Sequence, residues 1–164
     1  MKKNVKKNKT KICFISSSGG HYEQLMMLKP LMREYDSYIV TEKTNYAARD
    51  SKKEYYISQI NRKEFTCIFK IICNFFKSFY IIIKEKPNII ISTGVLATIP
   101  TCLLGKLFKK KIIYIESFAK IDSPTETGKL MYKIADQFYV QWESMLKIYP
   151  NAIFKGGIYW YLLQ

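Results

Sequence analysis

Two short segments rich in glycine and hydroxyl groups, residues 16–21 (SSSGGH) and 92–94 (STG), are the first candidates for chemistry in this sequence. Small residues let a backbone approach an anion closely, and the start of a helix points unpaired N–H groups toward it. One such segment is often an ordinary turn, but two at corresponding strand ends would form a cradle of diphosphate size. The diphosphate ligands that we predict are Ser18, Gly19, Gly20, Thr93 and Gly94.

Two titratable residues, His21 and Glu116, are predicted at the same edge of the fold. The positive end of a helix disfavours imidazolium, so a neutral His21 could accept a proton from a sugar hydroxyl; the alternative is a purely local hydrogen bond. Glu116 follows an apolar run and would either bind the acceptor sugar or orient the loop after it. With a single histidine and four cysteines that lack CxxC spacing, we predict neither a metal nor a cofactor.

Neither of two common nucleotide motifs is present. A dinucleotide site requires G-x-G-x-x-G, whereas residues 16–21 read SSSGGH, and Glu42 at a strand end is not sufficient by itself. Residues 123–130 (SPTETGKL) lack the first glycine and the terminal hydroxyl of a P-loop.

Strand and helix signals alternate along the chain, which is 164 residues long and therefore of single-domain size. This alternation predicts an α/β fold, a Rossmann-like parallel sheet with helices on both faces, whose ligands bind beyond the carboxyl ends of the strands. We expect a flexible basic tail (1–10), one acceptor-binding domain (11–157) and a C-terminal docking segment (158–164). The predicted strands are 11–16, 37–41, 54–58, 88–92, 111–115 and 137–141, and the predicted helices are 21–34 (kinked or shortened at Pro30), 65–84, 95–108 and 126–135.

Residues 65–84 form the most apolar of these helices. Two lysines within this span argue against a membrane crossing, because each costs about 2.5–3.5 kcal/mol at the bilayer centre. The helix is therefore buried in its own domain, docked on a partner or laid in a membrane interface. Its polar positions fall on one narrow stripe: Thr66, Lys70, Asn74, Lys77 and Ser78. The residues that we predict to face a membrane are Lys70, Phe75, Phe76 and Lys77.

The chain is strongly basic, with 27 Lys and Arg against 13 Asp and Glu, a net charge of +14. This balance predicts an anionic partner: nucleic acid, an acidic membrane surface or a phosphate-bearing substrate. Nucleic acid is disfavoured because the aromatic residues lie mostly in apolar runs instead of alternating with lysines. The lysine-rich start is followed by only four apolar residues, too few for a signal peptide, whose core has roughly 7–15. A cytoplasmic protein peripherally associated with the inner face of the cell membrane is expected.

Residues 18–21 (SGGH), 92–94 (STG), 115–117 (IES) and 155–157 (KGG) together resemble the acceptor-side, N-terminal half of a GT-B glycosyltransferase. Within that fold, the sequence resembles the accessory subunit of the two-chain N-acetylglucosaminyltransferase of dolichol-linked oligosaccharide synthesis and its bacterial capsule and exopolysaccharide homologues. It is more distantly similar to the N-terminal domain of the lipid II-forming N-acetylglucosaminyltransferase. The resemblance covers roughly residues 11–159.

The resemblance implies a division of labour. One chain binds the polyprenyl-diphosphate-linked sugar acceptor at the cytoplasmic face of the membrane, and a separate catalytic subunit carries the nucleotide-sugar site. The eukaryotic subunit is anchored by a membrane-spanning N-terminus, in whose place this sequence has a basic tail. The C-terminal segment is implied to contact the catalytic subunit, through Tyr159 and Trp160; packing onto its own domain is the alternative.

We therefore predict an accessory subunit of a polysaccharide-biosynthesis glycosyltransferase, not catalytic alone, with His21 as the candidate base of the assembled pair. One alternative is a self-sufficient small glycosyltransferase that binds a nucleotide sugar in its first glycine-containing segment. A third, less favoured, is a basic nucleic-acid-binding module.

Overall fold

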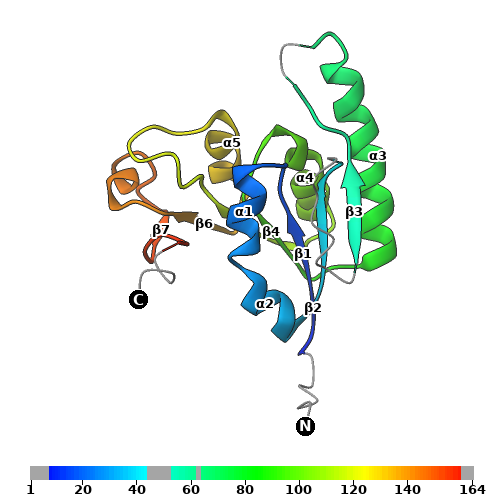
Figure 1. The fold of residues 1–164 in the computed structure, drawn as a ribbon, viewed down its shortest axis with the longest axis horizontal. Helices are drawn as coiled ribbons and strands as arrows, with labels where there is room; N and C mark the ends of the chain where they lie inside the picture. Colours follow the sequence, from blue (N-terminus) through cyan, green and yellow to red (C-terminus); the bar gives the residue numbers. More distant parts are fainter. Residues whose placement is uncertain (1–7, 44–52, 62–63, 160–164) are drawn as a thin grey trace.

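A computed structural model of the chain describes residues 8–43, 53–61 and 64–159. These residues contain a seven-stranded sheet of order β3-β2-β1-β4-β5-β6-β7, in which every neighbouring pair is parallel (Figure 1). The strands are β1 (Asn8–Ile15), β2 (Tyr35–Glu42), β3 (Glu54–Ile57), β4 (Ile89–Ser92), β5 (Lys111–Ile115), β6 (Gln137–Val140) and β7 (Ile153–Phe154). The helices are α1 (Gly20–Met26), α2 (Lys29–Glu34), α3 (Cys67–Glu85), α4 (Ile99–Leu107) and α5 (Glu126–Ile134), with 3-10 turns η1 (Leu96–Thr98) and η2 (Glu143–Lys147).

The core lies in two layers, one on each face of the sheet. Successive residues of a strand point to opposite faces, so in β1 Ile12 and Phe14 pack with residues of α1 and α2, whereas Cys13 and Ile15 pack with residues of α3, α4 and α5. Figure 1 shows α1 and α2 together on one side of the sheet. The predicted fold class, a parallel sheet with helices on both faces, is confirmed.

Most of the predicted elements are present, with shifted ends. The helix expected at 21–34 is divided into α1 and α2, because Pro30 occupies the first turn of α2, where its missing N–H is not needed. β1 begins at Asn8 and β2 at Tyr35, before their predicted starts, and β7 and η2 were not predicted. Residues 1–7 and 160–164 lie outside the described residues, so the basic tail and Trp160 stay predictions.

Helix α3 directs two residues of its polar stripe, Asn74 and Ser78, into the domain, whereas Thr66 and Lys77 are exposed. The Asn74 side chain is buried, accepting from the backbone N–H of Ser58 and donating to its carbonyl, both at 2.8 Å. The Ser78 hydroxyl, also buried, is 2.7 Å from that of Thr101 on α4. These bonds attach one face of α3 to the end of β3 and to α4, and this attachment fixes which face remains outside.

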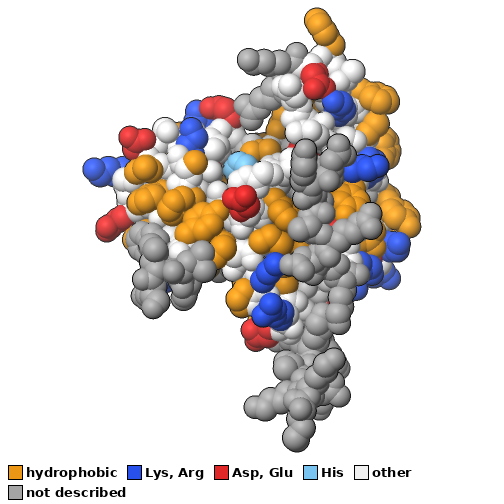
Figure 2. Space-filling view, in the orientation of Figure 1, with side chains coloured by type: hydrophobic (Ala, Val, Ile, Leu, Met, Phe, Trp, Pro, Cys, Tyr) orange, Lys and Arg blue, Asp and Glu red, His pale blue; other side chains and the backbone are white. Residues whose placement is uncertain are grey.

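The outer face of α3 is apolar and uncovered. Phe69 is 68% exposed and Phe76 64%, and Leu107 on the adjoining α4 is 73% exposed. In Figure 2, hydrophobic side chains follow the outer edge of the molecule over α3. Burial of this helix in its own domain is therefore not what the structure shows. The exposed apolar residues on α3 or just before it are Phe65, Ile68, Phe69, Ile72, Phe75, Phe76, Phe79, Tyr80 and Ile83. Together with Leu103 and Leu107 of α4, they form what we call the α3 surface.

No helix among the described residues is both long enough and apolar enough to cross a membrane. An exposed apolar area of this size marks a site of interaction with a lipid or protein surface.

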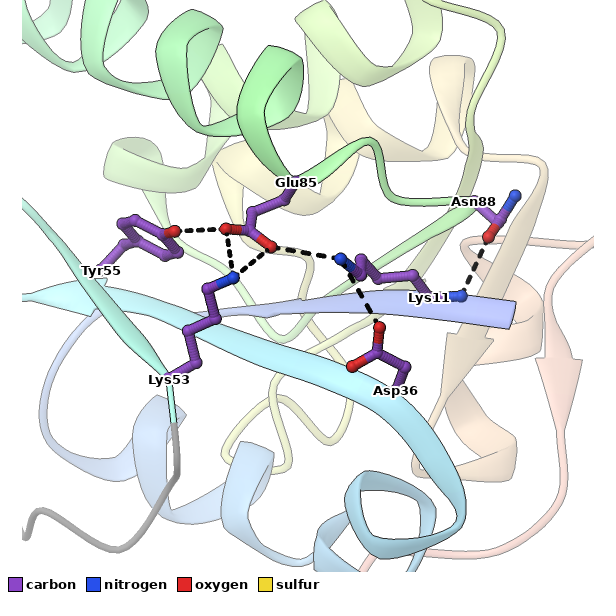
Figure 3. A network of polar contacts seen from close by, with 6 residues as sticks. All are labelled: Lys11, Asp36, Lys53, Tyr55, Glu85 and Asn88. Carbon is purple, nitrogen blue, oxygen red and sulfur yellow. Dashed lines mark hydrogen bonds and ion pairs between the residues drawn. The ribbon is translucent and has the colours of Figure 1, made fainter. Parts of the chain in front are cut away.

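At the C-terminal end of α3, the buried carboxylate of Glu85 connects α3 with β1 and β3 (Figure 3). Its oxygens accept from Lys53 just before β3 (2.7 and 2.8 Å), from the Tyr55 hydroxyl of β3, and from Lys11 of β1 (3.4 Å). Lys11 also lies 3.5 Å from Asp36. Burial by itself raises the pKa of Glu85, but the hydrogen bonds from Lys53 and Tyr55 outweigh burial and hold the pKa below its ordinary value.

Replacement of this carboxylate should destabilise the chain in a pH-dependent way. Because its pKa is depressed in the folded state, Glu85 contributes stability above the unfolded-state pKa, about 4.3, and this contribution is lost as the pH falls through the folded-state value. We expect Glu85→Gln to lower the free energy of unfolding by roughly 1.5–3 kcal/mol at pH 7, with the deficit shrinking below about pH 4. Urea unfolding across pH tests this, with the exposed Glu34→Gln as control; equal effects of the two variants would contradict it.

Candidate functional site

The two glycine-containing segments lie side by side at the carboxyl edge of the sheet. β1 pairs with β4, and the chain leaves β1 toward β2 on one side and β4 toward β5 on the other, so this pair is the topological switch point of the sheet, where ligands of open α/β folds bind. The Ser17 N–H donates to the Gly94 carbonyl at 3.0 Å, and the Thr93 N–H donates to the Ile15 carbonyl at 3.3 Å. The expected adjacency of the segments is thus present in the structure.

His21 and Thr93 are joined by two reciprocal hydrogen bonds. The imidazole Nδ1 lies 2.7 Å from the Thr93 carbonyl oxygen, and the Thr93 hydroxyl donates to the His21 carbonyl oxygen at 2.9 Å. A carbonyl oxygen only accepts, so Nδ1 carries the proton of this bond, and Nε2 of the neutral ring keeps its lone pair. No hydrogen bond joins Nε2 to another residue of the described chain. In its neutral form the fixed imidazole therefore has Nε2 as its proton acceptor.

Ser18 is engaged by a residue that the sequence interpretation did not include in the site. Its backbone N–H and its hydroxyl donate to Oε2 of Glu42, at 3.1 and 2.9 Å. Glu42 is buried, and its other oxygen accepts from the Ile60 N–H at 3.4 Å. In this arrangement the donors of Ser18 are not directed at a ligand, whereas Gly19 and Gly20 are exposed. In the sequence, the only indication of this contact was the position of an acidic residue, Glu42, at the carboxyl end of β2.

Glu116 lies in a closed cluster of hydrogen bonds. It is 1% exposed, and it accepts from the Ser117 N–H (2.9 Å), the Thr125 hydroxyl (2.9 and 3.2 Å) and the Tyr149 hydroxyl (3.2 Å). Burial and the Glu116 charge both raise the pKa of Tyr149, so that hydroxyl stays a donor. A Cβ at Gly128 would lie 1.8 Å from the carboxylate, so glycine is required there.

The geometry of Glu116 matches the second of its two expected roles, orientation of the loop that follows. Direct contact with an acceptor sugar stays a prediction, and this cluster would have to open for it.

The C-terminal residues of the described chain pack beside an apolar cavity. Tyr159 meets Phe118 edge-on at 5.0 Å between ring centroids, so part of its surface is used within the domain. A cavity of about 300 Å³ lies next to residues 155–158, on the α2 side of the sheet. Its other lining includes Leu28, Leu31, Ile113, Ile115 and Tyr139. Partner contact by Tyr159 stays a prediction.

Comparisons with known proteins agree with this architecture. Residues 12–158 match the family described as "Oligosaccharide biosynthesis protein Alg14 like". This chain belongs to the Alg14 family. The human UDP-N-acetylglucosamine transferase subunit ALG14 is 27% identical over 177 residues, an alignment that covers 90% of this chain and 82% of the human one.

Other relatives of this Alg14-family chain are longer. The Borrelia garinii pyrophosphoryl-undecaprenol N-acetylglucosamine transferase is 29% identical over 92% of this chain, which spans only 46% of that enzyme. Acinetobacter baumannii MurG superposes with a TM-score of 0.70 and 15% identity, over 83% of this chain and 43% of MurG. The UDP-N-acetylglucosamine 2-epimerase of Rickettsia bellii gives a TM-score of 0.74 and 13% identity, over 95% of this chain and 47% of the epimerase. The fold is that of one half of a GT-B glycosyltransferase, as expected.

The close approach at Gly94 provides a test of the site geometry. Gly94 has φ +99°, and a Cβ there would lie 3.1 Å from the Tyr114 hydroxyl and 3.5 Å from the His21 ring. We expect Gly94→Ala to lower the free energy of unfolding by about 1–3 kcal/mol, because alanine is strained at this φ, and to shift the His21 ring resonances in NMR spectra. Gly20→Ala is the matched control, since no atom lies within 4 Å of its Cβ position. Equal stability and unchanged His21 resonances in Gly94→Ala would contradict the packing described.

Proposed function

We propose that this Alg14-family chain is the acceptor-binding subunit of a two-chain glycosyltransferase. It binds a polyprenyl-diphosphate-linked sugar at the carboxyl edge of its sheet, on the cytoplasmic face of a membrane, and works with a separate catalytic subunit. The observation that carries the proposal is the pair of reciprocal hydrogen bonds between His21 and Thr93, which joins the two loops and leaves Nε2 of the imidazole without a hydrogen-bond partner among the described residues.

The diphosphate would lie against the exposed backbone of Gly19 and Gly20. Gly94 is buried, and its N–H is bonded to the Ser92 hydroxyl at 3.2 Å, so it would bind the diphosphate only by exchanging that bond. Ser18 would contribute only by exchanging its bonds to Glu42, whose charge disfavours a phosphate immediately beside it. Glu42 therefore limits how far the anion extends along the first loop. Thr93 would act chiefly by holding the imidazole.

His21 would serve as the general base. As the acceptor hydroxyl oxygen forms its bond to the anomeric carbon of the donor sugar, Nε2 takes the hydroxyl proton and the nucleotide diphosphate leaves with the bonding electron pair. The donor site lies on the partner in this scheme. The relatives named UDP-N-acetylglucosamine transferase subunits support N-acetylglucosamine as the transferred sugar.

The α3 surface would hold the chain on an anionic membrane. Its aromatic and aliphatic side chains are exposed, and lysines surround it: Lys77 on α3, Lys84 and Lys86 at its end, and Lys109 after α4. An apolar face bordered by lysines is the pattern of an interfacial helix. The first turns of α3 extend beyond the carboxyl end of β3 (Figure 1), so a membrane bound at the α3 surface would lie toward the edge of the sheet that carries the acceptor loops. Of the residues predicted to face the membrane, Phe75 and Phe76 are exposed, Lys77 is bonded to Ser58 and Lys70 to Glu64.

The base can be tested in the purified complex with its catalytic partner. We expect His21→Ala to lower transfer from UDP-N-acetylglucosamine to a polyprenyl-diphosphate-linked sugar by about 10²–10⁴-fold, with complex formation unchanged on a sizing column. Glu23→Gln, an exposed change two residues further along α1, is the control. Full activity of His21→Ala would remove His21 from the mechanism, and turnover by this chain without a partner would favour the self-sufficient enzyme.

Membrane attachment can be tested by sedimentation with vesicles of phosphatidylglycerol and phosphatidylcholine. Phe69→Ser combined with Phe76→Ser should weaken binding at least tenfold, because burying each phenylalanine contributes about 1.5–3 kcal/mol. Ile121→Ser, which changes an exposed apolar residue in the loop after β5, should leave binding unchanged. Equal binding by the double variant and the wild type would contradict the α3 surface as the attachment site.

A further inference from the structure

A buried pair of amides, Gln24 of α1 and Gln141 after β6, connects the C-terminal segment with the acceptor site. The two side chains are 5% and 3% exposed. The Gln141 amide nitrogen donates to the Gln24 oxygen (2.9 Å) and to the Glu116 carbonyl oxygen (2.8 Å), while its own oxygen accepts from the Ile158 N–H (3.0 Å). All three bonds are within ordinary hydrogen-bond length.

The Ile158 N–H and the Glu116 carbonyl oxygen together fix the orientation of the Gln141 amide. Because the Ile158 N–H needs an acceptor, the Gln141 oxygen faces the C-terminal segment and its nitrogen faces Gln24. If Ile158 moved away, the Gln141 oxygen would lose its donor, although the Glu116 carbonyl would still face the amide nitrogen. A buried polar group without a partner costs about 1–3 kcal/mol, so the order of Ile158 and the placement of the Gln141 amide, which also bonds Gln24, are linked energetically.

A second route joins the same two parts of the chain. Tyr159 packs on Phe118, and the Phe118 N–H donates to the Gln24 oxygen at 3.2 Å. Trp142 also packs on Phe118 and donates its indole N–H to the Phe118 carbonyl at 2.7 Å. Both routes therefore end at one atom, the side-chain oxygen of Gln24, three residues after His21 on the same helix.

We propose that Gln141 is a positioning residue, which couples the order of residues 155–159 to the placement of α1 and its His21 loop. A ligand that orders the acceptor loops orders the C-terminal segment through Gln24 and Gln141, and a partner bound at that segment fixes the acceptor loops in return. Such coupling is reciprocal by thermodynamic necessity. The inference rests on the proposed acceptor function, and it adds the means by which partner and acceptor affect one another.

Hydrogen–deuterium exchange of the full chain tests the coupling, with farnesyl diphosphate as a short polyprenyl diphosphate probe. In the wild type, saturating probe should slow exchange at residues 16–21, and also slow exchange at residues 155–159 by about fivefold or more. In Gln141→Met, which keeps side-chain length but removes both hydrogen-bonding groups, protection at residues 16–21 should remain. Protection at residues 155–159 should fall to the part that the Tyr159–Phe118 contact transmits. Gln137→Met, at the opposite end of β6, is the matched control and should behave as the wild type.

The possible outcomes separate this inference from the function on which it rests. Failure of the probe to bind the wild type would overturn the acceptor proposal, and the coupling with it. Binding that protects residues 16–21 but not residues 155–159 in the wild type would overturn the coupling alone, as would full protection of both regions in Gln141→Met. If Gln141→Met does not fold, Gln24→Met removes the same hydrogen bond from the side of α1. The exchange of residues 16–21 and 155–159 in that variant then supports or contradicts the coupling in the same way.

Discussion

The parallel pairing of β1 with β4 is the constraint on which the candidate site depends. It places the loop after β1 against the loop after β4, although residues 16–21 and 92–94 are far apart along the chain. Once the strands are adjacent, their last backbone groups are close enough for Ser17 to bond Gly94 and for His21 to bond Thr93. An imidazole held by a carbonyl oxygen loses rotational freedom before any ligand arrives, which is the condition for an effective base.

The sequence allowed the fold to be predicted because its signals were local. Short β-branched runs such as β5 (Lys111–Ile115) are separated by helix-length segments, and that alternation has few topological solutions. β7 (Ile153–Phe154) was missed because two residues carry no periodicity, and η2 because its single turn follows a strand directly. Pro30 predicted a kink or a shortening of the first helix, and the structure instead divides that helix into α1 and α2.

The candidate site was predictable only in part. Glycine and hydroxyl content located both loops, and strand order explains their adjacency. The bonds from Ser18 to Glu42 and from Thr125 to Glu116 depend on tertiary contacts between segments 24 and 9 residues apart, for which no local pattern exists. The orientation of α3 could not be predicted from the sequence either, because a polar stripe is compatible with a hydrogen-bonded interior and with a solvent-exposed face. In the structure Asn74 and Ser78 have hydrogen-bond partners inside the domain, and these bonds turn the apolar face outward.

An apolar outer helix also has a cost for the chain that carries it. Contact of Phe69, Phe76 and Leu107 with water is unfavourable. Copies of the chain that have not bound lipid therefore tend to associate with one another through these side chains. The strong positive charge opposes this self-association by mutual repulsion, most effectively at low ionic strength. Concentrated salt therefore screens the charge repulsion but leaves the apolar α3 surface exposed. Purification of this chain calls for buffers of low ionic strength or a mild detergent.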